Sequence, residues 1–259
     1  TQTHNLYLRQ TDVPSSTPLL LDLLYEYDRV RRFYPHPTQV SAITEVAKKI
    51  DLDAGHREKL VAALREQNQG PAASKHLDLL AQPGTVVVAT GQQVGFYGGP
   101  VFSLYKALTA LKLAATLRKN GTPAVTVFWL ATEDHDLDEV SHAWVFNDRS
   151  EPFRLDAQPE KATGRPVGDL KVHDPTPEIL EEALKTLPFG AEACQWITDA
   201  NLPGSTFQAG FQSLYETLLK SYGLIFLNPM RPALRQLAQP LFHAALVNAH
   251  TLSKALLER

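Results

Sequence analysis

The sequence predicts an α/β fold built on a parallel sheet. From Gly84 onward, short apolar runs alternate with helical patterns, the order expected when helical crossovers join parallel strands. An apolar run at 85–89 ends in a loop that holds four glycines, and a second run at 124–132 is apolar on both faces. Because both of its faces are apolar, the second strand is expected to lie centrally in the sheet, covered by helices.

A helical segment is predicted ahead of this sheet, over residues 1–82. An amphipathic helix, LLLDLLYEYDRVRRFY, follows Pro18, and Thr38 and Asp53 are suitable N-caps for two further helices. A short helix at 72–82 then stops at a Pro-Gly pair. The segment carries few residues that could take part in catalysis.

The glycine-rich loop is predicted to lead into a helix over about 100–119. Pro100 suits a first helical turn, and the pair Asn120-Gly121 is typical of a helix end. After the second strand, SHAWVFN at 141–147 and EPFRLD at 151–156 flank a turn sequence. A short antiparallel pairing of these two segments is expected.

An insertion divides the predicted sheet. Residues 157–205 are rich in proline, glycine and charge, with one amphipathic helix near 176–187. The alternation then resumes with a helix capped at Gly223 and a buried strand at 224–227. Residues 231–259 are interpreted as the start of a long helix, since no helix-stop sequence occurs there.

Composition argues against several classes of partner. The chain has 259 residues, 44% of them hydrophobic and 20% charged, enough for a sizeable core. A net charge of -3 provides no field for nucleic acid or an anionic membrane. No apolar run approaches the roughly 20 residues that cross a bilayer. With no apolar leader and with Cys194 as its only cysteine, the chain is expected to be cytoplasmic.

The glycine-rich loop, TGQQVGFYGGP, predicts an anion site. Glycines let the backbone approach a phosphate, and N–H groups at the start of the next helix point toward negative charge. Ser103 and Lys106 are expected to face this ligand or solvent, because Tyr105 and Leu108 are assigned to the core side of the helix. The candidate ligand-binding residues are Thr90, Gly91, Gln92, Gln93, Gly98, Gly99, Ser103 and Lys106. The loop matches neither common nucleotide-binding motif, so a turn without a ligand remains the alternative.

A second polar group, Glu133, Asp134, His135 and Asp136, directly follows the second strand. Open parallel sheets bind ligands beyond the carboxyl ends of their strands, and Asn228 follows the last strand in the same way. Three carboxylates around one imidazole predict a raised pKa for His135 and a carboxylate that serves as a base or a magnesium ligand. No tightly bound metal is expected. A loop that merely caps the next helix is the alternative.

Nucleophilic catalysis has little support in the sequence. No G-x-S-x-G pattern occurs, and Cys194 lies in the apolar context AEACQWI, where a packing role is the simpler interpretation. Trp129, inside the second strand, is assigned to the core.

Two stretches, TGQQVGFYGGPVFSLYKAL at 90–108 and VFWLATEDHDLDEVSH at 127–142, together resemble one family, the bacillithiol biosynthesis cysteine-adding enzymes. The resemblance extends along the chain to LIFLNP and the helix after it. It implies a Rossmann-like core at 83–230, similar to class I nucleotidyltransferases, with a connecting insertion at 157–205. It also implies that 231–259 begins a coiled coil through which family members form homodimers.

The resemblance further implies an enzyme that adds L-cysteine to the amine of glucosaminyl malate. Joining a carboxylate to an amine requires activation of the carboxylate, as an acyl phosphate or an adenylate, so ATP with Mg²⁺ is the expected cofactor. We assign acid–base chemistry to His135, a substrate-amine or magnesium role to Asp134 or Asp136, and substrate contacts to Glu133 and Asn228. Two alternatives stay open: a module that binds a nucleotide or sugar acid without catalysis, and a ligase for another amino sugar.

Overall fold

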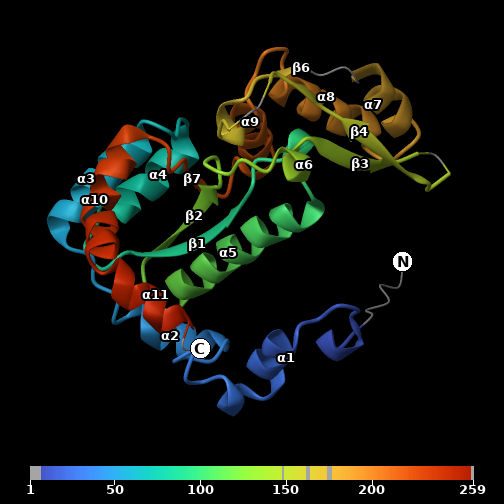
Figure 1. Ribbon diagram of the computed structural model, residues 1–259. Helices are drawn as coiled ribbons and strands as arrows, with labels where there is room; N and C mark the ends of the chain where they lie inside the picture. The colour runs from blue at the N-terminus through green and yellow to red at the C-terminus, as the bar shows by residue number, and fades with distance from the viewer. Residues whose placement is uncertain (1–6, 148, 162–163, 174–176, 258–259) are drawn as a thin grey trace.

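A three-stranded parallel sheet forms the centre of the computed structural model, which describes residues 7–147, 149–161, 164–173 and 177–257 (Figure 1). The strand order is β1-β2-β7, and the strands are β1 (Val86–Gln92), β2 (Ala124–Leu130) and β7 (Ile225–Leu227). The central position predicted for β2 is confirmed, and six of its seven residues are buried. The exception is Trp129, whose exposed fraction is 45%, so its assignment to the core was wrong.

Helices cover both faces of this sheet (Figure 1). Phe128 of β2 packs in one cluster with residues of α5 (Val101–Lys119) and α9 (Phe207–Leu219). Val125 and Val127, on the opposite face of the strand, pack against α3 (Ala54–Arg65) and α4 (Pro71–Leu80). The alternation of side chains along β2 thus divides the core into two layers.

The first strand is longer than the apolar run predicts. It continues through Thr90 and Gly91 to Gln92, because the backbone of β1 stays paired with β2 up to Leu130. The glycine-rich turn therefore lies between Gln93 and Pro100 and contains a short 3₁₀ turn, Phe96–Gly98. Pro100 is the N-cap of α5.

The N-terminal segment is helical, as predicted, with different boundaries. Helix α1 (Pro18–Tyr25) is followed by a separate 3₁₀ turn, Tyr27–Arg29, where a longer helix was predicted. Asp53 caps α3 as expected, since its carboxylate accepts the N–H of His56. Thr38 was the wrong cap: α2 (Val40–Ala47) begins after Gln39, without a side-chain cap.

The predicted antiparallel pair is confirmed as β3 (His142–Phe146) and β4 (Pro152–Asp156).

The insertion holds two helices, α7 (Pro177–Leu184) and α8 (Gly190–Ala200), where the sequence predicted one. The predicted start at 176 lies outside the described residues. Helix α8 was missed because it begins at a glycine after Phe189, without a capping Ser, Thr, Asp or Asn. Two-residue strands pair within this region, β5 (Gln158–Pro159) with β6 (Val172–His173).

The C-terminal segment forms two helices, α10 (Pro232–Val247) and α11 (Ala249–Leu257), so the prediction of one unbroken helix was wrong. The break is at Asn248, whose side-chain amide donates to the carbonyl of Ala244. Helix α10 lies against α3 (Figure 1). Homodimerisation through a coiled coil stays a prediction. Across the described part of the chain, no helix combines the length and apolarity that a membrane span requires.

Candidate functional site

A chain of hydrogen bonds joins the ends of β1 and β2. The ammonium of Lys106, on α5, donates to the Gln92 amide oxygen at 2.7 Å, and Gln92 donates to the Gln93 amide oxygen at 2.6 Å. The Gln93 amide then donates to two carboxylates, Asp134 at 3.2 Å and Glu139 at 2.8 Å. The loop after β1 and the acidic motif after β2 therefore meet, as predicted from the ends of adjacent parallel strands.

Asp134 is held by backbone donors of its own loop. Its Oδ1 accepts the N–H groups of His135 at 2.7 Å and Asp136 at 3.2 Å. The N–H of Asp136, followed by that of His135 and the amide of Gln93, lowers the pKa of the Asp134 carboxyl below its usual value, against the opposing effect of burial. Asp134 is consequently a weak base and a persistent negative charge, better suited to holding a cation than to removing a proton.

The other acidic-motif residues lie closer to solvent than the prediction of a crowded imidazole implied. The His135 side chain is 87% exposed, and its Nδ1 lies 3.9 Å from Asp134 Oδ1. Asp136 caps the short helix α6 (Leu137–Val140) by accepting the N–H of Glu139. The capping role that was the alternative interpretation therefore applies to Asp136. Glu133 is exposed beside them.

Gly98 and Gly99 do not present free N–H groups to a ligand, contrary to the prediction. Their N–H groups donate within the turn, to the carbonyls of Gly95 at 3.2 Å and Phe96 at 3.0 Å. Gly98 is buried against α9: a Cβ there would lie 2.9 Å from a methyl carbon of Leu214. Its φ of +90° also favours glycine. These glycines serve the packing of the turn.

Ser103 faces the core, so the predicted orientation of α5 was wrong for this residue. Its side chain is fully buried, whereas Tyr105 and Leu108, assigned to the core, are 64% and 37% exposed. Ser103 lies near Tyr215 of α9, whose pKa is raised to about 12 by burial, with the Ser103 hydroxyl acting in the opposite direction. Lys106 was placed correctly, because its ammonium reaches the strand ends and lies 5.2 Å from the ring centroid of Phe102.

Asn228 joins the ends of β2 and β7 and is almost fully buried. Its Oδ1 accepts the hydroxyl of Thr132 at 2.7 Å and the N–H of Met230 at 2.9 Å, and its own N–H donates to Gln67. These contacts give it a structural role at the strand ends.

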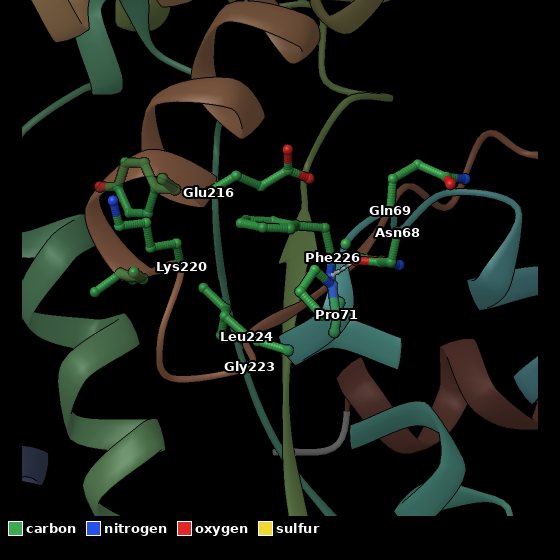
Figure 2. Close-up of a pocket in the computed structure, with 13 residues that line it drawn as sticks. Asn68, Gln69, Pro71, Glu216, Lys220, Gly223, Leu224 and Phe226 are labelled. Atoms are coloured by element: carbon green, nitrogen blue, oxygen red, sulfur yellow. Dashed lines mark hydrogen bonds between the residues drawn. The ribbon is translucent and has the colours of Figure 1, made fainter. Parts of the chain in front are cut away.

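A separate small cavity, of about 120 Å³, lies beside the start of β7 (Figure 2). There the Asn68 side-chain amide makes two hydrogen bonds to the backbone of Phe226. Its oxygen accepts the Phe226 N–H at 2.7 Å, and its nitrogen donates to the Phe226 carbonyl at 2.8 Å. This amide takes the place of a further strand and covers the edge of the sheet. None of the residues that line this cavity belongs to the hydrogen-bonded chain from Lys106 to Asp134, so the cavity is no part of the candidate site.

Glu139 is the site residue that the sequence interpretation missed. The pattern Asp136-x-x-Glu139 resembles a capping box, in which the glutamate would bond back to the start of its own helix. Its carboxylate bonds to Gln93 instead. Together with Lys106 the site offers a cation on one side and two carboxylates on the other, joined through Gln92 and Gln93. In the described part of the chain, no three His, Cys, Asp or Glu residues gather as a metal-binding group.

The parallel sheet, its helices on both faces and the polar groups at its strand ends define a Rossmann-like α/β domain. Residues 4–259 match the model of one family, described as bacillithiol biosynthesis BshC, N-terminal Rossmann-like domain. The chain belongs to this family.

Three relatives share the name "Putative cysteine ligase BshC". The protein from Solibacter usitatus is 42% identical over 99% of this chain and 48% of its own length. Those from Koribacter versatilis and Salinibacter ruber are each 32% identical, over 96% and 86% of this chain and 47% and 43% of their own lengths. The chain thus spans about half the length of the relatives it matches.

Proposed function

We propose that this chain is the catalytic N-terminal part of an ATP-dependent ligase that forms an amide between L-cysteine and the amine of glucosaminyl malate in the cytoplasm. The family and the names of the relatives support a ligase in bacillithiol biosynthesis. The observation that carries the proposal is the hydrogen-bonded chain from Lys106 through Gln92 and Gln93 to Asp134 and Glu139.

An α-amino acid fits the charges of this chain. Its carboxylate needs a cation, which Lys106 provides, and its ammonium needs negative charge, which Asp134 and Glu139 provide. The lowered pKa of Asp134 keeps that carboxylate charged at neutral pH. Gln93 contacts both carboxylates and is in turn bonded to Gln92, so it holds them in place for the ammonium group.

The same residues partly fit ATP with Mg²⁺. Lys106 is a suitable partner for a phosphate, and magnesium bound with a nucleotide needs only one or two protein carboxylates, which Asp134 and Glu139 supply. The N–H groups of Gly98 and Gly99 are used within the turn and are left out of this proposal. When bound, ATP would activate the cysteine carboxyl group for attack by an amine.

Amide formation releases one proton from the attacking amine. His135 is placed to accept it, because its imidazole is exposed at the same strand end and lies 3.9 Å from the Asp134 carboxylate. The nitrogen of the amino sugar then forms the new bond to the cysteine carbonyl carbon, and the activating group leaves with the electrons of its bond. Asp134 and Glu139 bind and orient in this scheme, whereas His135 moves the proton.

Mass spectrometry of the products tests the proposal directly. The protein is incubated with L-cysteine, ATP, Mg²⁺ and glucosaminyl malate, alongside the Solibacter usitatus relative as a longer reference protein. We expect the mass of the two substrates less one water, dependent on ATP and lost in the Lys106→Ala variant. Binding of both substrates without product, under conditions where the relative reacts, would favour a binding module instead. Product with another amino sugar in preference would correct the substrate.

A further inference from the structure

A large cleft lies beside the candidate site, on the face of the sheet that α3 and α10 cover. Its volume is about 600 Å³, within the range of small-molecule sites. Trp129 of β2 and Leu227 of β7 contribute from the sheet, and Leu234 and Phe242 from α10. Glu133, the residue before Asp134, also lines the cleft, which therefore reaches the first residue of the acidic motif.

Trp129 is exposed in this cleft because its neighbour on β1 is a glycine. Gly91 is paired with Trp129 in the strand register. A Cβ at position 91 would lie 2.9 Å from the Trp129 Cβ and 2.7 Å from its carbonyl oxygen. Any larger residue at 91 would therefore collide with the Trp129 backbone and crowd the indole. The glycine leaves an aromatic surface uncovered, and the exposed fraction of Trp129 is 45%.

The chemistry of the lining favours a flat aromatic ring over a sugar. A pyranose carries hydroxyl groups around its rim, and each needs a polar partner when it is buried. Among the described residues that line the cleft, the polar side chains are those of Glu133, Arg235 and Gln239; the others are apolar. A nucleobase has two apolar faces for Trp129 and Phe242, and its few edge groups match an acceptor such as Glu133 and donors such as Arg235.

We propose that this cleft is a nucleobase site, in which an adenine ring stacks on Trp129 beneath α10. The choice of adenine rests on the ATP dependence proposed above. The site itself rests on the exposed indole, the glycine beside it and the apolar walls. Trp129 is then a binding residue that acts on the base, separate from the Lys106 group that is assigned to charged ligands.

Binding of adenosine, which has no phosphate, tests the site without the ligase reaction. Adenosine affinity is measured by calorimetry for the wild-type protein and for Trp129→Ala. Loss of one base-stacking side chain should weaken adenosine binding by about tenfold. Trp144→Ala is the matched control, because Trp144 is also exposed, at 61%, but lies on β3 outside the cleft. Thermal unfolding shows whether each variant is folded, and Trp129→Phe keeps a ring and should lose less affinity.

Three results would overturn the inference: unchanged adenosine affinity in Trp129→Ala, an equal loss in Trp144→Ala, or no adenosine binding to the wild type. So would protection of Trp129 from acrylamide quenching before any ligand is added, since another protein segment would then fill the cleft. Binding of tripolyphosphate, which has no base, is measured in parallel, so that a failure of this inference can be told from a failure of the proposed function. Adenosine binding that needs Trp129, without tripolyphosphate binding or ATP-dependent ligation, would support the base site and refute the ATP-dependent ligase.

Discussion

The Gln93 side chain donates to the Asp134 carboxylate at 3.2 Å and so connects two loops that are 41 residues apart in the sequence. The contact is possible because β1 and β2 are neighbouring parallel strands in register up to Gln92 and Leu130. Residues that directly follow these two positions emerge at the same edge of the sheet. Gln93 also bonds to Glu139, so one amide holds both carboxylates of the candidate site.

Replacing Gln93 with alanine should therefore lower activity more than stability. Both carboxylates lose a donor, and their positions relative to Lys106 become less fixed. We expect ligation to fall by about tenfold to a hundredfold, equivalent to the roughly 1.5–3 kcal/mol typical of hydrogen bonds to charged groups. Steady-state kinetics with cysteine as the varied substrate measures the effect.

The control for Gln93→Ala is Gln195→Ala. Gln195 makes the same kind of bond, from its amide to the Asp199 carboxylate at 2.7 Å, on helix α8 of the insertion. The Gln195→Ala variant should leave the rate of ligation unchanged. Equal activity losses in the two variants would mean that the effect of Gln93 is a general one on stability.

The meeting of these loops could be predicted from the sequence because it depends on local features. The apolar runs at β1 and β2 and the polar residues directly after them are visible in one pass along the chain, and parallel pairing then brings them together. The antiparallel pair β3 and β4 was equally local, since a short turn sequence separates two alternating segments. Lys106 does reach the strand ends as predicted, although the prediction rested on Tyr105 and Leu108 facing the core, and both are exposed.

Three of the errors, at Gly98, Ser103 and Trp129, concern residues whose environment is set by distant segments. Gly98 and Ser103 suit a ligand loop by local criteria, and they are buried because α9, more than a hundred residues later, packs on them. Trp129 has the composition of a core residue, and it is exposed because Gly91 lies beside it on the next strand. A single sequence contains no direct record of such contacts. Glu139 was missed because its pattern also fits a helix cap.

Packing against α9 predicts a large cost for Gly98→Ala. The φ of Gly98 is +90°, and a Cβ would lie 2.9 Å from Leu214 Cδ2. Strain of the backbone and displacement of Leu214 should together cost about 2–4 kcal/mol in the free energy of unfolding. Gly204→Ala isolates the strain, since its φ is +81° with no atom within 4 Å of the added Cβ, and should cost about 1–2 kcal/mol. Urea unfolding compares the two; similar losses would contradict tight packing at Gly98.

The lowered pKa of Asp134 predicts how stability depends on pH at the acid end. A carboxyl group whose pKa is lower in the folded state stabilises the protein above its unfolded pKa, about 3.9, and this contribution is lost as pH falls through the lower folded value. The stability difference between wild type and Asp134→Asn should thus be constant near neutral pH and shrink as the pH falls below about 4. Asp199→Asn, on the exposed surface of α8, is the control. Urea titrations from pH 7 to pH 3 measure the difference, and a gap that does not change with pH would contradict the assigned contacts of Asp134.

Tyr215 gives the corresponding prediction at the alkaline end. Its hydroxyl donates to the carbonyl of Gly98 at 3.2 Å, and burial raises its pKa to about 12. Tyr215→Phe removes this bond and should cost about 1 kcal/mol in the free energy of unfolding at neutral pH.

Because the folded pKa is the higher one, the contribution of Tyr215 is complete below its unfolded pKa, about 10, and is lost as pH rises toward 12. The gap between wild type and Tyr215→Phe should therefore narrow across this window. Tyr222→Phe, at an exposed tyrosine just after the same helix, should show no such gap. If the difference in the free energy of unfolding between wild type and Tyr215→Phe persists at pH 12, the hydroxyl is not buried between α9 and the glycine-rich turn.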